Sequence, residues 1–262
     1  MNATRLLADD DPHPVRVLRA DGPSDLFFTA DHAGRDIPRC LGRLGVAESE
    51  LTRHIAWDIG ISGVTERLSA AFNATAIFQT YSRLVIDCNR APGVSSSIPE
   101  ISEHTRIPGN IGLSDADKAT RVAEIFTPYH DRIKALLDSR AAAACRTVYI
   151  AMHSFTPTFK GESRAMEVGV LYNRDRKLAS ILLDLLRAEG DLTVGDNAPY
   201  AVSDLTDYGV PVHAERRGMD HVEIEIRQDL IADAAGEAAW AERMARLLSA
   251  ADARLKATQS TV

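Results

Sequence analysis

The segment HVEIEIR, residues 221–227, alternates ionisable with aliphatic side chains. In a strand, successive side chains point to opposite faces, so the ionisable ones would share one face. They are His221, Glu223, Glu225 and Arg227. Two carboxylates beside an imidazole suit general acid–base catalysis if this face lines a pocket. If the face meets water instead, the same groups would form ordinary cross-strand salt bridges.

Two other apolar segments of the chain end in a histidine. LFFTAD is followed by His32, and VYIAM is followed by His153. In open α/β sheets, ligands bind beyond the carboxyl ends of the strands. A single histidine after a strand is more often structural. Because the pattern occurs twice and a carboxylate-rich strand accompanies it, we expect the two imidazoles to converge on one metal ion.

Other catalytic motifs are absent from the sequence. It has no GxGxxG after a strand, no GxxxxGK[ST] phosphate loop, no GxSxG elbow and no HExxH. The three cysteines, Cys40, Cys88 and Cys145, are scattered and form no CxxC zinc knuckle. A zinc hydrolase with ligands dispersed along the chain is the chemistry that remains.

Composition narrows the class of protein further. The 262 residues carry a net charge of -7, which disfavours nucleic acid as the partner. No apolar run approaches the roughly 20 residues that span a bilayer, and the N-terminus lacks a signal-peptide core. An odd number of cysteines scattered along the chain is typical of reduced thiols. We therefore expect a cytoplasmic protein with neither nucleic acid nor membrane as its partner.

The elements that must position these side chains alternate between strands and helices. We predict strands at 25–32, 75–80, 83–88, 147–153, 166–172, 191–196 and 221–227. We predict helices at 51–72 with a break near Gly60, from Ser114 to about 143, at 174–190 closed by Gly190, and at 230–256. Residues 91–113 read as a long functional loop. This predicts a single α/β domain over 25–256, after an N-terminal extension of residues 1–24, with a mixed, mostly parallel sheet and helices on both faces.

Five segments together resemble the N-formylglutamate amidohydrolase family: TADHAGRDIP, HIAWDIG, YSRLVIDCNR, AMHSF and EIEIRQDL. The resemblance covers about residues 25–250, and the order of the segments is its specific part. It implies a zinc-exopeptidase-like, phosphorylase/hydrolase-like fold related to the zinc carboxypeptidases and aspartoacylases. It also implies one Zn²⁺ per chain, or another divalent metal, and hydrolysis of an amide bond in amino-acid metabolism.

The resemblance also implies roles for individual residues. It makes His32 and His153 metal ligands and Glu225 the general base. Glu223 could pair with Arg227, which would leave Glu225 free. Substrate contacts are implied for Arg83, Asn89 and Arg90, with Arg90 also acting at the reacting carbonyl. Asp87 is expected to fix Arg83 or Arg90, and His213 is a further candidate for substrate binding, or else a surface histidine.

The third metal ligand departs from the family pattern. Relatives of the carboxypeptidase type carry a glutamate three residues after the first histidine, and this sequence has Arg35 there. A guanidinium cannot bind a cation. Asp58, in HIAWDIG, is the preferred replacement, and Asp36 is the local alternative.

These features predict a metal-dependent hydrolase that cleaves the amide bond of a small N-acyl amino acid, N-formylglutamate or a relative of it. Two other functions fit parts of the sequence. A non-catalytic protein that binds a small carboxylate would explain Arg35, and a peptidase would act on a glutamyl or cell-wall peptide. The sequence does not indicate an oligomeric state.

Overall fold

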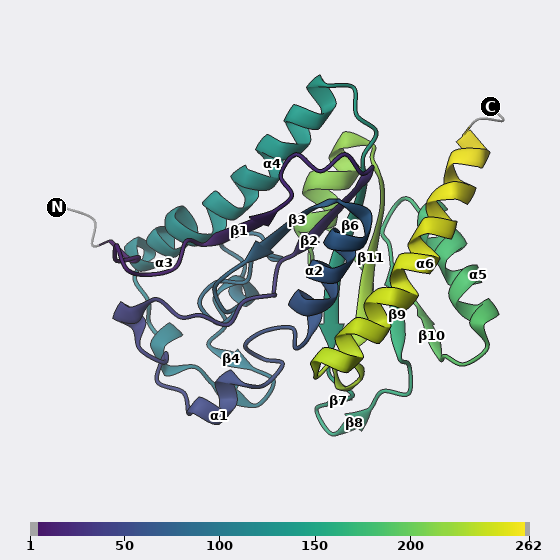
Figure 1. Ribbon diagram of the computed structural model, residues 1–262. Helices are drawn as coiled ribbons and strands as arrows, with labels where there is room; N and C mark the ends of the chain where they lie inside the picture. The colour runs from purple at the N-terminus through teal and green to yellow at the C-terminus, as the bar shows by residue number, and fades with distance from the viewer. Residues whose placement is uncertain (1–4, 260–262) are drawn as a thin grey trace.

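A seven-stranded sheet forms the centre of the computed structural model, which describes residues 5–259 (Figure 1). Its strands lie in the order β1, β3, β2, β6, β11, β9, β10. They are β1 (Val15–Leu18), β2 (Leu26–Ala30), β3 (Thr75–Gln79), β6 (Val148–Phe155), β9 (Val168–Leu171), β10 (Val194–Asp196) and β11 (Asp220–Arg227). The four central strands β3, β2, β6 and β11 run parallel, whereas β1 and β9 run antiparallel to their inner neighbours. The predicted mixed, mostly parallel sheet is confirmed.

The predicted N-terminal extension contributes to this sheet. Its strand β1 pairs with β3, so that Val15 lies opposite Gln79. Residues 15–18 therefore form one edge of the sheet.

Helices cover both faces of the sheet, as predicted. On one face, α2 (Ile61–Phe72), α5 (Lys177–Glu189) and α6 (Ala234–Gln259) pack on apolar strand residues such as Phe28, Ile150 and Ile224 (Figure 1). On the other face, α4 (Thr127–Ala142) packs on Phe27 and Tyr149. A helix from α3 (Asp115–Arg121) through one π-helical turn to α4 confirms the long helix predicted after Ser114. None of the helices in residues 5–259 is long and apolar enough to cross a membrane.

One predicted strand is wrong, and one predicted helix is correct only from its break at Gly60 onward. Residues 83–88 form turns instead of a strand, although Leu84, Val85 and Ile86 are buried. The helix predicted over 51–72 consists only of the short α1 (Glu48–Leu51) and of α2, with turns between them. Gly60 precedes α2 with a φ of +79°, a left-handed conformation that a continuous helix does not contain. Both irregular segments place side chains at the site described next.

Two small hairpins lie near the end of the sheet where β6 and β11 finish (Figure 1). The first, β4 (Ile101–Ser102) with β5 (Thr105–Arg106), belongs to the loop predicted over 91–113. The second, β7 (Thr158–Phe159) with β8 (Glu162–Ser163), follows β6 directly.

Candidate functional site

The polar face of β11 does not meet water. Val222, Ile224 and Ile226 pack in the core under α5 and α6, so the alternation turns Glu223 and Glu225 to the opposite face. There they are only 4% and 6% exposed. Glu225 lies opposite His153 of the parallel strand β6, because the register pairs these two positions. The alternation therefore reflects a buried polar site and not a solvated edge.

The two predicted histidine ligands and Asp58 form one buried cluster. Each of the three residues offers one ligand atom, and these atoms all lie within 4.8 Å of one another. Asp58 Oδ2 is 3.6 Å from His32 Nδ1 and 3.1 Å from His153 Nδ1. Asp36, the alternative third ligand, is exposed and outside this cluster. The geometry favours Asp58.

The turns around Asp58 are what bring its carboxylate to the histidines. Its backbone N–H donates to the carbonyl of His32 at 2.8 Å. Its Oδ2 accepts from the backbone N–H of Ser154 at 3.1 Å. Arg35, three residues after His32, stacks its guanidinium over the ring of Trp57 at 5.3 Å.

The charges of this cluster depend on one another. Burial by itself would raise the pKa of Asp58, but the neighbouring imidazoles of His32 and His153, the second of which is hydrogen-bonded to it, hold this pKa well below its usual value. Burial would lower the pKa of His153, but the carboxylates of Glu223, Asp58 and Glu225 raise it well above its usual value. The site therefore keeps the buried carboxylate of Asp58 ionised and stabilises a positive charge beside it.

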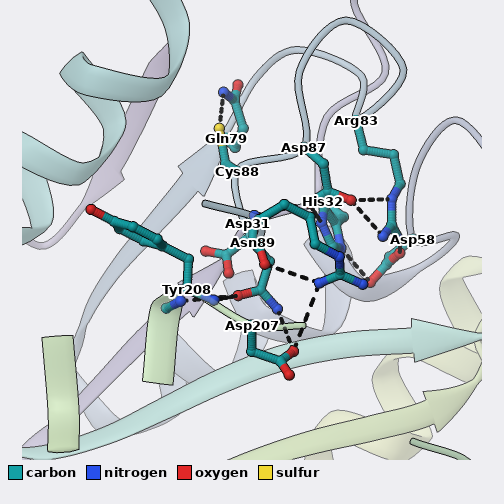
Figure 2. A network of polar contacts seen from close by, with 12 residues as sticks. Asp31, His32, Asp58, Gln79, Arg83, Asp87, Cys88, Asn89, Asp207 and Tyr208 are labelled. Atoms are coloured by element: carbon teal, nitrogen blue, oxygen red, sulfur yellow. Dashed lines mark hydrogen bonds and ion pairs between the residues drawn. The ribbon is translucent and has the colours of Figure 1, made fainter. Parts of the chain in front are cut away.

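Asp87 connects His32 to Arg83 (Figure 2). Its Oδ1 accepts from His32 Nε2 at 2.7 Å, and its Oδ2 accepts from Arg83 Nε and Nη2 at 3.0 and 2.7 Å. Burial alone would raise the pKa of Asp87, but Arg83 and His32 hold it well below its usual range. The expected pairing of Asp87 with Arg83 is confirmed, and its bond to His32 is a contact that the sequence did not reveal.

The bond to Asp87 decides which nitrogen of His32 is free. Because Nε2–H donates to the carboxylate, the neutral form of this imidazole has its lone pair on Nδ1. This buried Nδ1 has no hydrogen-bond partner among residues 5–259 and lies on the side of Asp58. A neutral imidazole with a free, buried lone pair beside a carboxylate and a second imidazole fits a divalent metal ion.

Asn89 and Arg90 line the cleft but already have partners within the chain. Asn89 Oδ1 accepts from the backbone N–H groups of Tyr208 and Gly209 at 2.8 and 2.9 Å, and its Nδ2 donates to Asp207 at 3.1 Å (Figure 2). Arg90 donates to the carbonyls of Asn89 and Thr206 and lies 3.8 Å from Asp207. In this structure both residues hold the 206–209 segment in place.

Glu223 and Glu225 are carboxyl groups poised near neutral pH. Burial is the main cause that raises the pKa of each to about 8. The Oε2 atoms of both have no hydrogen-bond partner within the described part of the chain. The expected pairing of Glu223 with Arg227 is wrong, because Arg227 bonds to Asp229 at 2.8 Å and faces Glu167.

His213 does not lie at the cleft. Its Nε2 is 2.8 Å from Nδ1 of His130, whose own Nε2 donates to the carbonyl of Cys88 at 2.8 Å. Both rings are buried, so His213 is not a surface histidine either. The structure places it in the core between α4 and β11, away from the residues that line the site.

The cluster opens into a cleft of about 500 Å³ at the carboxyl ends of the parallel strands. Besides the predicted site residues, its wall includes His54, Glu103, Phe155, Phe159 and Tyr200. Asp31 lies next to this wall and was assigned no role from the sequence. Its Oδ2 has no hydrogen-bond partner in residues 5–259 and lies 3.9 Å from His153 Nε2. Asp31 directly precedes His32 at the end of a strand, and this position is the signal by which the sequence could have indicated it as a site residue.

Fold and site together define an α/β protein with a buried His–Asp–His cluster and two glutamates at the end of a parallel sheet. The model of the N-formylglutamate amidohydrolase family matches residues 24–232, and the chain belongs to this family. The prediction of a hydrolase is thereby confirmed at the level of the family.

Solved structures share the fold. The gene product Atu2144 from Agrobacterium tumefaciens is 37% identical, with a TM-score of 0.93 over 96% of this chain and 100% of that one. An N-formylglutamate amidohydrolase from Ralstonia eutropha JMP134 is 17% identical, with a TM-score of 0.66 over 92% of this chain and 98% of that one. The second likeness concerns the fold alone. No curated protein matches the chain.

Proposed function

We propose that this protein hydrolyses the amide bond of a small N-acyl amino acid, N-formylglutamate or a relative of it, with one divalent metal ion. The observation that carries the proposal is the buried cluster of His32, Asp58 and His153 beside Glu225. Membership of the N-formylglutamate amidohydrolase family supports the same substrate class.

The donor set suits Zn²⁺. Two imidazoles and one carboxylate are the three protein ligands typical of catalytic zinc, and they leave a position open. They also leave one net positive charge on the site. Zn²⁺ held there would supply Lewis acidity toward an amide carbonyl and toward the attacking water.

Glu225 is positioned to move the proton. It lies on β11 directly beside His153, with Oε2 free of hydrogen bonds to residues 5–259. Burial raises its pKa to about 8, and a cation at the neighbouring cluster would favour its ionised form. The ionised carboxylate accepts a proton from the attacking water and passes it to the leaving nitrogen. Arg83, fixed by Asp87, faces the same space with a positive charge.

Metal content and amide hydrolysis test the proposal together. We expect about one zinc per chain in the wild-type protein and formate release from N-formylglutamate. The double variant His32→Ala, His153→Ala should lose both, whereas the exposed His13→Ala should lose neither. Well-folded wild-type protein that takes up no zinc would refute the mechanism. Tight binding without turnover would favour a carboxylate-binding protein, and turnover only of glutamyl peptides would favour a peptidase.

A further inference from the structure

Carboxylates dominate the wall of the cleft. They are the side chains of Asp58, Asp87, Glu103, Asp207, Glu223 and Glu225. An anionic substrate therefore needs a cation that these groups do not already neutralise. Arg83 is bonded to Asp87 and lies 3.5 Å from Asp58, and Arg90 is held by two carbonyls beside Asp207. The charge of each of these two arginines is therefore already partly compensated within the protein.

Arg164 is a different kind of cation. It follows the β7–β8 hairpin, and its backbone N–H closes that hairpin by donating to the carbonyl of Pro157 at 2.8 Å. Its guanidinium lies over the rings of Phe159 and Tyr200, each at 4.8 Å, and over Phe155 at 5.7 Å. All three rings line the cleft. The hairpin thus places a guanidinium directly behind the aromatic part of the cleft wall.

The charge of this guanidinium acts on Glu225 at the floor of the cleft, but no carboxylate of the described residues touches it. Within residues 5–259, Arg164 forms no ion pair, and its only side-chain hydrogen bond goes from Nη1 to the hydroxyl of Tyr200 at 2.9 Å. Aromatic rings are attracted to the face of a guanidinium, whereas its N–H groups point outward in the plane. The Nε–H and Nη2–H groups therefore remain available to an incoming acceptor, in the fork geometry that matches a carboxylate.

Arg164 is not itself part of the cleft wall but stacks on three rings that are, and this position at the rim indicates which carboxylate it meets. The reacting amide must lie at the buried floor, beside His153 and Glu225. The α-carboxylate is attached to the carbon that carries the amide nitrogen, so it stays near that floor and near Arg83. Arg164 is only partly buried, and its partner Tyr200 is 43% exposed, so this pair lies at the rim. A carboxylate at the far end of an amino-acid side chain would extend to it.

We propose that Arg164, oriented by Tyr200 and the two phenylalanines, binds the side-chain carboxylate of the substrate and selects N-acyl derivatives of acidic amino acids. This inference rests on the proposed function and assigns its specificity to a residue of the β7–β8 hairpin region.

The test compares two substrates that differ only in that carboxylate. Wild-type protein and Arg164→Gln are assayed with N-formylglutamate and with N-formylglutamine, whose side chain ends in a neutral amide of the same shape. A charge-assisted fork contact corresponds to roughly 10- to 100-fold in kcat/KM. We expect Arg164→Gln to lose that factor for N-formylglutamate and to change little for N-formylglutamine. Arg164→Lys, which keeps the charge without the fork, should fall between, and so should Tyr200→Phe.

Arg176→Gln is the matched control, because Arg176 also stacks on an aromatic ring, that of Tyr172 at 5.1 Å, but outside the cleft. It should keep the wild-type preference. Zinc content and melting temperature show that each variant is folded. An unchanged ratio between the two substrates in Arg164→Gln would overturn the inference while leaving the proposed function intact.

A binding measurement separates the two proposals if the wild-type protein hydrolyses neither compound. Calorimetry with glutarate, a simple dicarboxylate, then reads the anion site without any chemistry. Binding that weakens at least tenfold in Arg164→Gln would support the inference although the proposed function had failed. Equal binding by both proteins, or no binding by either, would overturn it.

Discussion

The two ring nitrogens of His32 face different partners. Nε2 donates to Asp87 at 2.7 Å, while Nδ1 lies 3.6 Å from Asp58. Such a carboxylate behind a metal-binding imidazole fixes its tautomer and orientation and makes it a better ligand. Under the proposed function, Asp87 would therefore support metal affinity without touching the ion.

Replacing this carboxylate by an amide tests that role. We expect Asp87→Asn to weaken zinc binding about 10- to 100-fold, since the amide keeps the shape but loses the charge that holds His32. Competition with a chelator measures the affinity. Asp207→Asn is the control, because Asp207 also lines the cleft but bonds to Asn89 and not to a histidine. Equal losses in both variants would mean that the cleft's total charge, and not the orientation of His32, sets the affinity.

The two glutamates of β11 should differ in function although their pKa values are alike. Glu225 pairs in register with His153, whereas Glu223 pairs with Ala151, two residues farther from the end of the strand. We expect Glu225→Gln to lower kcat about 10²- to 10⁴-fold while zinc is retained, since a positioned general base contributes that much. Glu223→Gln should lower kcat less. A larger loss in Glu223→Gln, in steady-state hydrolysis of N-formylglutamate, would reverse the two roles.

Individual site residues could be predicted from the sequence, whereas their hydrogen-bond partners could not. His32, His153 and Glu225 follow from strand ends and alternation, together with the family resemblance. The partners of Asn89 and Arg90 lie some 120 positions away along the chain, in the 206–209 segment. Local patterns contain no information on such contacts, because loop conformation sets them.

At the level of elements, apolar runs and one alternating segment predicted the inner strands of the sheet, and one apolar run was misread. LVI, in residues 84–86, is buried like a strand, but its neighbours bond to two different segments of loop. Arg83 N–H donates to the carbonyl of Ala56, and Asp87 N–H donates to that of Ser97. A short apolar run shows that a segment is buried without showing its backbone conformation. Here the turns present Arg83 and Asp87 on the same side, toward the cluster.

Gly60 is the point where the irregular segment carrying Asp58 joins α2. Its φ is +79°, and an added Cβ would lie 1.9 Å from the carbonyl oxygen of Ile231. Gly218 is left-handed too, with a φ of +64° and a ψ of +27°, but a Cβ there meets nothing within 4 Å. We expect Gly218→Ala to cost about 1 to 2 kcal/mol from backbone strain alone. Gly60→Ala should cost clearly more, since backbone must move, and denaturant unfolding measures the difference. Equal costs would show that the loop around Ile231 yields freely.

At the scale of the whole molecule, the sheet separates two environments. The face under α2, α5 and α6 is mainly apolar, and the opposite face changes along β6 from Tyr149 and Ala151 to His153. The polar side chains thus gather where the parallel strands end, as the sequence predicted. The strand from residues 15–18 was not predicted, because four residues of mixed burial give no clear period.

The core beneath α4 contains a second pair of histidines, and it should make the stability of the whole protein depend on pH. Burial lowers the pKa of His130 to about 4 and, together with the charge of His130, lowers that of His213 to about 2. Unfolded histidine titrates near 6.5, so between that pH and the folded pKa the unfolded chain binds more protons. Stability contributed by these neutral rings is complete above about pH 6.5 and is lost as the pH falls. Between pH 7 and pH 5, one such histidine accounts for about 2 kcal/mol of the free energy of unfolding.

The variant His213→Gln tests this pH dependence. From pH 7 to pH 5, we expect its free energy of unfolding in urea to fall by about 2 kcal/mol less than that of the wild-type protein, whatever its stability at pH 7. Parallel stability curves for the two proteins would show that His213 is protonated in the folded state as easily as in the unfolded one.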